Sequence, residues 1–213
     1  MFRHLQIWQA GEEYTIKQGK YPVIFLTFKD VKESNWKNAL QKIKRLIQKE
    51  FLRHKYLRAD QGLEAEERAY FEGVVKLKAG LSDYEDSLER LSDYLARHHH
   101  QKVLLLIDEY DTPIQAGYVN GYYAEVVGFM RNFLSGGLKD NSSLEKGVLT
   151  GIMRIAKESI FSGLNNPGVF TLLSRSFVDK FGLTEPEVKQ VLQDYRVANH
   201  YQDVNKWYNM TFG

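Results

Sequence analysis

The chain has 213 residues, of which 43% are hydrophobic and 26% charged, a composition typical of a folded globular protein. Its net charge of +2 is too small to indicate a nucleic-acid partner by itself, and the absence of cysteine excludes disulfides and cysteine-ligated zinc. No apolar window has the length of a membrane span, and the opening MFRHLQIWQAGEEY lacks the apolar core of a signal peptide. We therefore expect a soluble, cytoplasmic protein with no membrane partner.

The first third of the chain predicts one buried strand followed by helices. Residues 23–28, VIFLTF, form a short apolar run rich in β-branched and aromatic side chains, which is typical of a buried strand. Ser34 then predicts a helix start, and apolar residues recur at three- and four-residue spacing as far as Phe51, opposite a face of Lys and Arg. Residues 64–78 predict a second helix.

A third helix is predicted to begin at a capping box formed by Ser82 and Glu85 and to close at His98–His100. Three adjacent histidines raise the question of a metal site. Neighbouring residues on a helix point in different directions, so they make a poor chelate. We favour a solvated helix end, where partial positive charge suits the helix dipole.

The stretch KVLLLIDEYDTP, residues 102–113, is the strongest signal in the sequence. Five consecutive aliphatic residues run directly into Asp108 and Glu109, with Asp111 close behind. Pro113 ends this second buried strand, because proline cannot continue a central ladder. A buried strand that ends in three carboxylates has either a solvated polar tip or a functional site at its end.

The remaining elements continue the alternation of helices and strands. After Gly121, apolar residues at helical spacing predict a helix, and Gly136 and Gly137 are expected to loosen or end it. Residues 146–154, KGVLTGIMR, predict a third strand, and residues 169–174 predict either a fourth strand or a short helical turn. A capping box over residues 184–187 predicts the last helix. Such alternation is typical of βαβ units with a parallel sheet and helices on both faces.

In open parallel sheets, ligands bind beyond the carboxyl ends of the strands. There Asp108 could hold Mg²⁺, directly or through water, while Glu109, pointing to the other side, could orient and polarise an attacking water. This is the hhhhDE pattern of a Walker B strand, although short strings of this kind also occur by chance.

The third strand carries two further candidates for such a site, Thr150 and Arg154. In P-loop ATPases of the additional-strand type, the strand beside Walker B carries a polar sensor of the γ-phosphate, a role that the Thr150 hydroxyl could fill. Arg154 could face phosphate oxygens as a planar multi-donor cation. The alternative for Arg154 is a surface salt bridge with Glu158, one helical turn on.

Five stretches together resemble the AAA-ATPase-like domain family: YPVIFLTFKDVKES, VLLLIDEYDTPI, FMRNFLSGGLKDN, GVLTGIMRIAKESIFSGLNN and a closing WYN. Those bacterial proteins usually carry a C-terminal nuclease-like domain of the PD-(D/E)XK type. The resemblance implies an α/β, three-layer P-loop NTPase-like parallel sheet with flanking helices. It also implies that Asp108 and Glu109 form the Walker B pair, that Asp111 contributes to cofactor binding, and that Thr150 and Arg154 belong to the sensor region.

The chain departs from that family pattern because it contains no G-x-x-x-x-G-K-[ST] Walker A loop, and Gly19-Lys20 is followed by Tyr21. A P-loop cradles phosphates with backbone amides and a lysine, so its absence removes the main phosphate-binding element. The resemblance therefore implies a fragment, with the sheet incomplete at the N-terminal P-loop strand. Residues 1–180 would be the ATPase core, and residues 181–213 the truncated start of a C-terminal helical segment.

The complete family member is expected to use Mg²⁺ and ATP, whereas this chain is expected to bind ATP weakly or not at all. An alternative is a non-catalytic interaction module, in which a homo-oligomer or a partner chain covers the open sheet edge. Nucleic acid would be bound only through the missing nuclease-like domain. Direct nuclease activity is disfavoured, because such sites need an acidic residue on one strand and an acid-x-Lys motif on the next. Glu145-Lys146 lacks the intervening residue, and Glu72 with Lys76 lies in a predicted helix.

Overall fold

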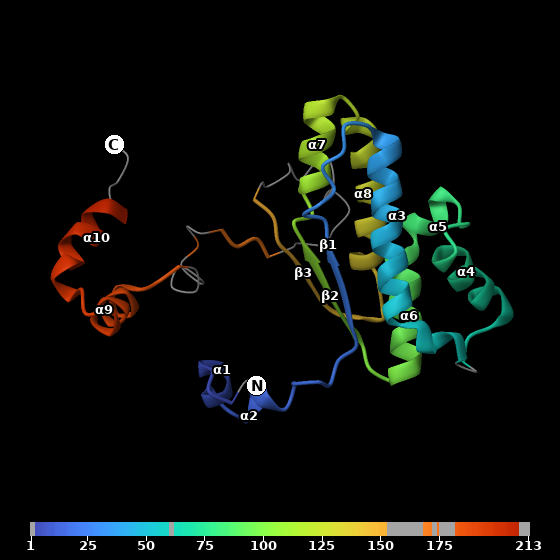
Figure 1. Cartoon of the computed structure of the whole chain (residues 1–213). Helices are drawn as coiled ribbons and strands as arrows, with labels where there is room; N and C mark the ends of the chain where they lie inside the picture. The colour runs from blue at the N-terminus through green and yellow to red at the C-terminus, as the bar shows by residue number, and fades with distance from the viewer. Residues whose placement is uncertain (1–2, 60–61, 153–167, 172–173, 175–181, 209–213) are drawn as a thin grey trace. The chain divides into compact units, whose positions relative to one another are not determined.

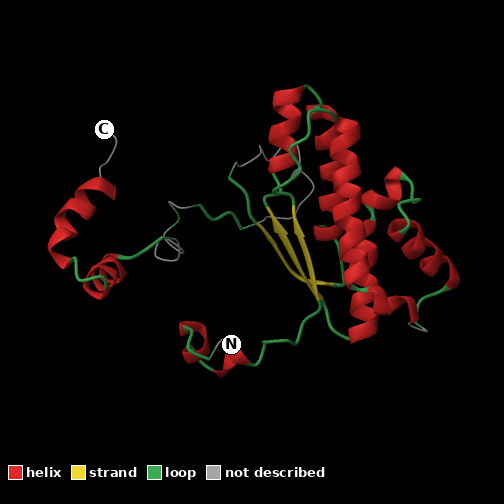
Figure 2. Cartoon of the chain, in the orientation of Figure 1, coloured by secondary structure: helices red, strands yellow, loops and turns green. Residues whose placement is uncertain are grey.

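The computed structural model describes residues 3–59, 62–152, 168–171, 174 and 182–208 (Figure 1). It divides into two compact units, Met1–Asn165 and Asn166–Gly213, and each is considered by itself. Helices and strands alternate through the first unit, as Figure 2 shows. In the first unit the elements are α1 (Gln6–Gln9), α2 (Glu12–Thr15), β1 (Val23–Thr27), α3 (Trp36–Arg53), a 3₁₀ turn η1 (Lys55–Ala59), α4 (Ala65–Val75), α5 (Leu81–Glu85), α6 (Ser87–His99), β2 (Val103–Asp108), α7 (Thr112–Asn120), α8 (Tyr123–Leu138) and β3 (Leu144–Leu149).

The three strands form a parallel sheet in the order β1-β2-β3, which confirms the predicted α/β fold with a parallel sheet. The acidic strand β2 is the central one. Its register places Leu106 between Phe25 of β1 and Val148 of β3, and places Asp108 opposite Thr27. All three strands therefore end at the same edge of the sheet, and β2 ends between its two neighbours.

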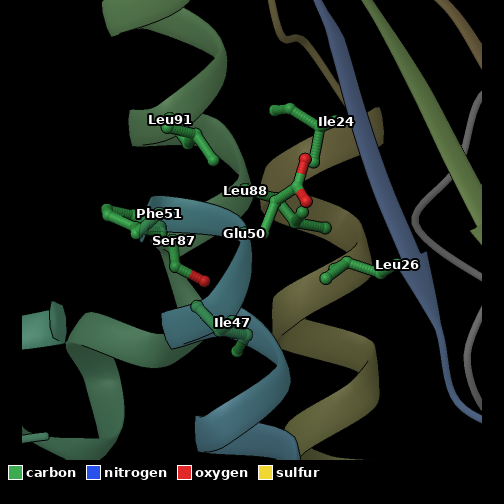
Figure 3. A pocket seen from close by; sticks show the side chains of 8 residues that line it. All are labelled: Ile24, Leu26, Ile47, Glu50, Phe51, Ser87, Leu88 and Leu91. Atoms are coloured by element: carbon green, nitrogen blue, oxygen red, sulfur yellow. The ribbon is translucent and has the colours of Figure 1, made fainter. Parts of the chain in front are cut away.

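One face of this sheet is packed by α3, α6 and α8 (Figure 1). Ile24, Leu26 and Leu105 point into that layer and are 0–4% exposed. A cavity of about 10 Å³ remains where Ile24 and Leu26 meet α3 and α6 (Figure 3). That volume is the least that a single water needs, so this part of the core holds no substrate-sized site.

The opposite face of the sheet differs from the prediction of helices on both faces. Phe25 is 45% exposed and Val148 is 44% exposed, and both point to this side. None of the described helices of the first unit packs on them. Parallel sheets usually have both faces buried, so among the described residues of the first unit no second helical layer covers this face.

The outer edge of β1 is blocked by a buried side chain. Glu50 of α3 is 6% exposed, and its Oε1 accepts a hydrogen bond of 2.9 Å from the backbone N–H of Phe25 (Figure 3). The same oxygen lies 3.3 Å from Nε2 of His54 and 3.2 Å from Nη1 of Arg53. The carboxylate thus occupies a backbone donor that an added strand would need.

Helix boundaries show three departures from the sequence prediction. The N-cap of α3 is Asn35 and not Ser34, and its side chain accepts from the N–H of Asn38 at 3.0 Å. The predicted capping box at residues 82–85 is wrong. Instead the side chain of Asp83 accepts a hydrogen bond of 2.7 Å from the N–H of Gly80, and the predicted single helix is divided into α5 and α6.

The sequence prediction was also wrong for two stretches after β2. Residues 112–120 form α7, which the pattern did not predict, with Pro113 in its first turn. Gly136 and Gly137 lie inside α8 and do not end it. The predicted helix end at the three histidines is confirmed, since α6 ends at His99 and His100 adopts a left-handed φ of 51°.

The second unit contains α9 (Glu185–Asp194), a 3₁₀ turn η2 (Ala198–His200) and α10 (Tyr201–Tyr208). The capping box of Thr184 and Glu187 at the start of α9 is confirmed. The strand or turn predicted over residues 169–174 lies partly outside the described residues, and the described part forms no regular element. No helix in the described portion of the chain is long and apolar enough to cross a membrane.

Close packing between α8 and α6 yields a stability prediction. A Cβ added at Gly137 would lie 2.8 Å from Cβ and Cδ1 of Leu88, so Gly137→Ala should lower the free energy of unfolding by about 1–3 kcal/mol. Gly128 of the same helix has open space around its Cβ position, so Gly128→Ala should raise it by about 0.5–1 kcal/mol. Urea unfolding of both variants measures the difference, and equal effects would contradict the packing.

Candidate functional site

The carboxylate of Asp108 lies at the end of the central strand and is held from both sides. Its Oδ1 accepts a hydrogen bond of 2.7 Å from the Thr150 hydroxyl, and its Oδ2 accepts one of 2.9 Å from the Thr27 hydroxyl. Each of the three strands therefore contributes one polar group to the same point. A carboxylate has about four acceptor positions, so both oxygens retain capacity for further donors or a cation.

Backbone pairing fixes this arrangement. The Thr150 N–H donates to the carbonyl of Ile107 at 2.9 Å, and the Tyr110 N–H donates to the carbonyl of Thr150 at 3.1 Å. On the other side, the Phe28 N–H donates to the carbonyl of Asp108 at 2.9 Å. The ladders thus continue one residue beyond the regular strands, so the two hydroxyls are aligned by the sheet itself.

The hydrogen bonds from Thr150 and Thr27 lower the pKa of Asp108 below its ordinary value, and the charge of Lys29 adds to the effect. Because the folded-state pKa is lower than the unfolded one, ionised Asp108 stabilises the fold above its unfolded pKa of about 3.9. That stabilisation is lost as the pH falls through the folded-state pKa. At neutral pH the site therefore presents a full negative charge.

Glu109, the residue that follows Asp108, adopts a strained backbone conformation. Its φ is 50°, a region that residues other than glycine rarely adopt and that costs of order 1–3 kcal/mol. Its Oε2 accepts a hydrogen bond of 3.0 Å from the hydroxyl of Thr112, the first residue of α7. Strain of this kind concentrates at functional sites, and the contact with Thr112 holds the carboxylate in one place.

Asp111 is buried, at 1% exposure, and connects two segments. Its Oδ2 accepts from Gln115 Nε2 at 2.7 Å and from the Ile152 N–H at 3.2 Å. A Cβ at Gly151 would lie 2.5 Å from Oδ1 of Asp111, so only glycine fits there. The carboxylate therefore ties the start of α7 to the segment that follows β3.

The structure brings together Asp108 and Thr150, while Glu109 and Asp111 lie beside them on the turn into α7. Arg154 lies outside the described residues. Sequence reasoning missed Thr27 and the partner of Glu109. A hydroxyl at the end of the first predicted strand was the available signal for Thr27, but its meaning depends on the strand order.

The described residues contain no group of three or more His, Cys, Asp or Glu that could enclose a metal ion. Mg²⁺ in nucleotide sites is usually bound through one or two carboxylates, waters and substrate phosphates, so a single ionised carboxylate fits it. Asp108 meets that need, because it is charged, half-exposed and keeps acceptor positions. The carboxylate of Glu72 instead pairs with Arg58 and Lys76 on the surface of α4, away from any strand.

A family model described as predicted AAA-ATPase matches residues 1–161, about three quarters of the chain, including Asp108, Glu109 and Thr150. The chain belongs to this family. The AAA-ATPase-like chain is also 30% identical over 110 residues to an uncharacterized protein in the vnfD 5′ region of Azotobacter chroococcum mcd 1. That alignment covers 51% of the AAA-ATPase-like chain and 21% of the relative. No solved structure matches the AAA-ATPase-like chain itself.

The hydroxyl contacts predict how the pKa of Asp108 responds to substitution of the neighbouring threonines. Thr150→Val removes the larger contribution and should raise the pKa of Asp108 toward its ordinary value, as followed by ¹³C NMR of the side-chain carboxyl during acid titration. Thr112→Val is the matched control, because Thr112 contacts Glu109 and not Asp108. An unchanged pKa in Thr150→Val, or an equal shift in the control, would contradict the assignment.

Proposed function

We propose that this chain supplies the acidic, hydrolytic half of a Mg²⁺-dependent ATPase site on a P-loop NTPase-like sheet. The observation that carries the proposal is the carboxylate of Asp108, which accepts hydroxyl hydrogen bonds from both neighbouring strands at the carboxyl edge of a parallel sheet. The match to the predicted AAA-ATPase family supports it independently. Ligands of open α/β sheets bind at this edge.

In this proposal Asp108 holds Mg²⁺ through the acceptor positions that the two threonines leave, directly or through water. The ion would neutralise charge on the β- and γ-phosphates of ATP. Thr27 and Thr150 keep the carboxylate ionised and fixed in orientation. The site is therefore set before any ligand arrives, which reduces the reorganisation needed on binding.

Glu109 is proposed to orient the attacking water and to accept its proton. It follows the metal-binding carboxylate directly in the sequence, and its hydrogen bond with Thr112 limits its motion. Thr150 is proposed to sense the γ-phosphate through its hydroxyl, and Arg154 to contact phosphate oxygens. Asp111 is proposed to act as a positioning residue, because its hydrogen bonds with Gln115 and Ile152 hold the segment that follows Thr150.

A complete site also needs backbone amides and a lysine around the phosphates, and these 213 residues contain no Walker A loop. We therefore expect the chain to bind Mg²⁺-ATP with a dissociation constant weaker than about 10 µM. Binding should depend on the metal, since Asp108 and the phosphates would otherwise repel each other. Removal of Mg²⁺ with EDTA should abolish it.

The test is ¹⁵N NMR of the chain titrated with Mg²⁺-ATP, alongside calorimetry. Amide shifts should concentrate at the ends of β1, β2 and β3 and disappear in Asp108→Asn. Asp194→Asn on α9 is the control and should behave as the unsubstituted chain, because the one hydrogen bond of Asp194 within the described part of the chain is to Gln190 of its own helix. Shifts that persist in Asp108→Asn would overturn the site. Affinity tighter than 10 µM would show that phosphate binding does not need a Walker A loop.

A second candidate function is a non-catalytic interaction module. The observation that favours it is the exposed side of the sheet, where Phe25 of β1 and Val148 of β3 are 45% and 44% exposed, together with the outer edge of β3, which pairs with no other described strand. Exposed strands with apolar side chains pair readily with other chains. In this reading the carboxyl-edge residues are retained for structure, and association is the function.

Association predicts a mass above 24.8 kDa in size-exclusion chromatography with light scattering, rising with concentration. Val148→Lys places a charge on the exposed sheet face and should return the mass to that of a monomer. Val119→Lys is the matched control, because Val119 is 80% exposed on α7 and lies off the sheet. A monomer at every concentration, or equal effects of the two substitutions, would count against this candidate.

A further inference from the structure

Charge is distributed unevenly over the described surface, and α3 carries the strongest concentration of it. This helix has six basic residues and a single acidic residue, Glu50, which is buried. The whole chain has a net charge of only +2. The small net charge therefore conceals a strongly basic helix.

Three of the six cations are engaged within the fold. Lys42 pairs with Glu33, Lys44 lies 4.8 Å from the centre of the Tyr84 ring, and Arg53 contacts Glu50 while its side chain stays 50% exposed. The other three are Lys37, Arg45 and Lys49. They are exposed and form no ion pair with any residue that the structure describes.

The three cations without an ion pair lie with Arg53 on one row of the helix, in which the neutral Gln41 is the second member. Lys37, Gln41, Arg45, Lys49 and Arg53 recur at every fourth residue, a spacing that makes a ridge on a helix. Each step advances about 6 Å along the axis and turns about 40°, so the ridge runs diagonally across the solvent face for about 24 Å. We call these five residues the α3 ridge.

The opposite face of α3 is fully used by the core. Ala39, Ile43, Ile47 and Phe51 are 0–2% exposed, and Figure 3 shows Ile47 and Phe51 on the side of α3 that faces β1 and α6. A helix that lies on a membrane needs its apolar face for insertion, and α3 has none to offer. The α3 ridge can therefore attract a ligand only through charge and hydrogen bonds.

A repeating row of cations fits a repeating row of anions. One strand of a duplex carries a phosphate about every 3.4 Å along the helix axis, so the α3 ridge can run beside about seven phosphates. Lysine and arginine at such positions neutralise phosphates and release counterions, without reading the base sequence. From the ridge, its length and its three exposed cations without an ion pair among the described residues, we infer that α3 binds the phosphodiester backbone of a nucleic-acid duplex.

This surface is separate from the strand-end site, because none of its residues contacts Asp108, Thr27 or Thr150. Nucleic-acid binding and nucleotide binding therefore stand or fall independently. The inference also differs from binding through a nuclease-like domain, since it places the contact within residues 37–53 of this chain.

The test uses a fluorescein-labelled DNA duplex of about 20 base pairs of arbitrary sequence, an RNA duplex of equal length, and fluorescence anisotropy from about 50 to about 200 mM NaCl. The chain should bind at low salt, and the tighter of the two duplexes identifies the natural one. Lys37→Gln/Arg45→Gln/Lys49→Gln should weaken binding at least about tenfold and reduce the log–log salt slope by about 2 to 3, since each phosphate contact contributes about 0.9.

A charge-matched control separates the ridge from general attraction. Lys17→Gln/Lys139→Gln/Lys206→Gln removes three exposed cations outside α3 and should leave affinity and salt slope nearly unchanged. Circular dichroism of both triple variants confirms that they fold, and glutamine keeps the helix propensity of α3. No binding at 50 mM NaCl, an equal loss in the control, or ridge-dependent binding only to phosphatidylserine vesicles would overturn the inference.

Discussion

The pairing of β2 between β1 and β3 is the constraint on which the rest of the molecule depends. Because the acidic strand is central, its last residue meets a hydroxyl from each neighbour, and Asp108 is oriented by Thr27 and Thr150 together. An edge position would have left one oxygen in solvent. The same order places Leu105 against α6 and α8, so the strand that carries Asp108 is anchored in the hydrophobic core.

The acidic strand and its two partners could be predicted because apolar runs of five or six residues bounded by polar ones are local signals. Thr27 could not be singled out, since the value of its hydroxyl appears only when β1 is known to pair with β2. The predictions of helix ends were wrong for a related reason. The hydrogen bond between Gly80 and Asp83 starts the helix before the capping box that was expected at residues 82–85. Gly137 remains helical because Leu88 packs against its Cα, where a side chain would not fit.

Backbone strain and charge distribution were equally hidden from composition. The positive φ of Glu109 follows from a turn that must leave the strand and enter α7 within four residues, a geometry that no residue type announces. The basic face of α3 was visible as a pattern, but only the fold shows that its other face is consumed by the core and that Glu50, its one acid, is turned inward. A mild net charge was therefore a poor guide to the surface.

The carboxylate of Glu50 gives the sheet a direction of growth. With the N–H of Phe25 already taken, β1 closes its side, and any further strand has to join at β3. A parallel strand added there would end next to Thr150 and not next to Thr27. Whatever that strand carried at its tip would lie beside Thr150, on the β3 side of the same carboxylate, so one glutamate on α3 decides on which flank of Asp108 the site can be extended.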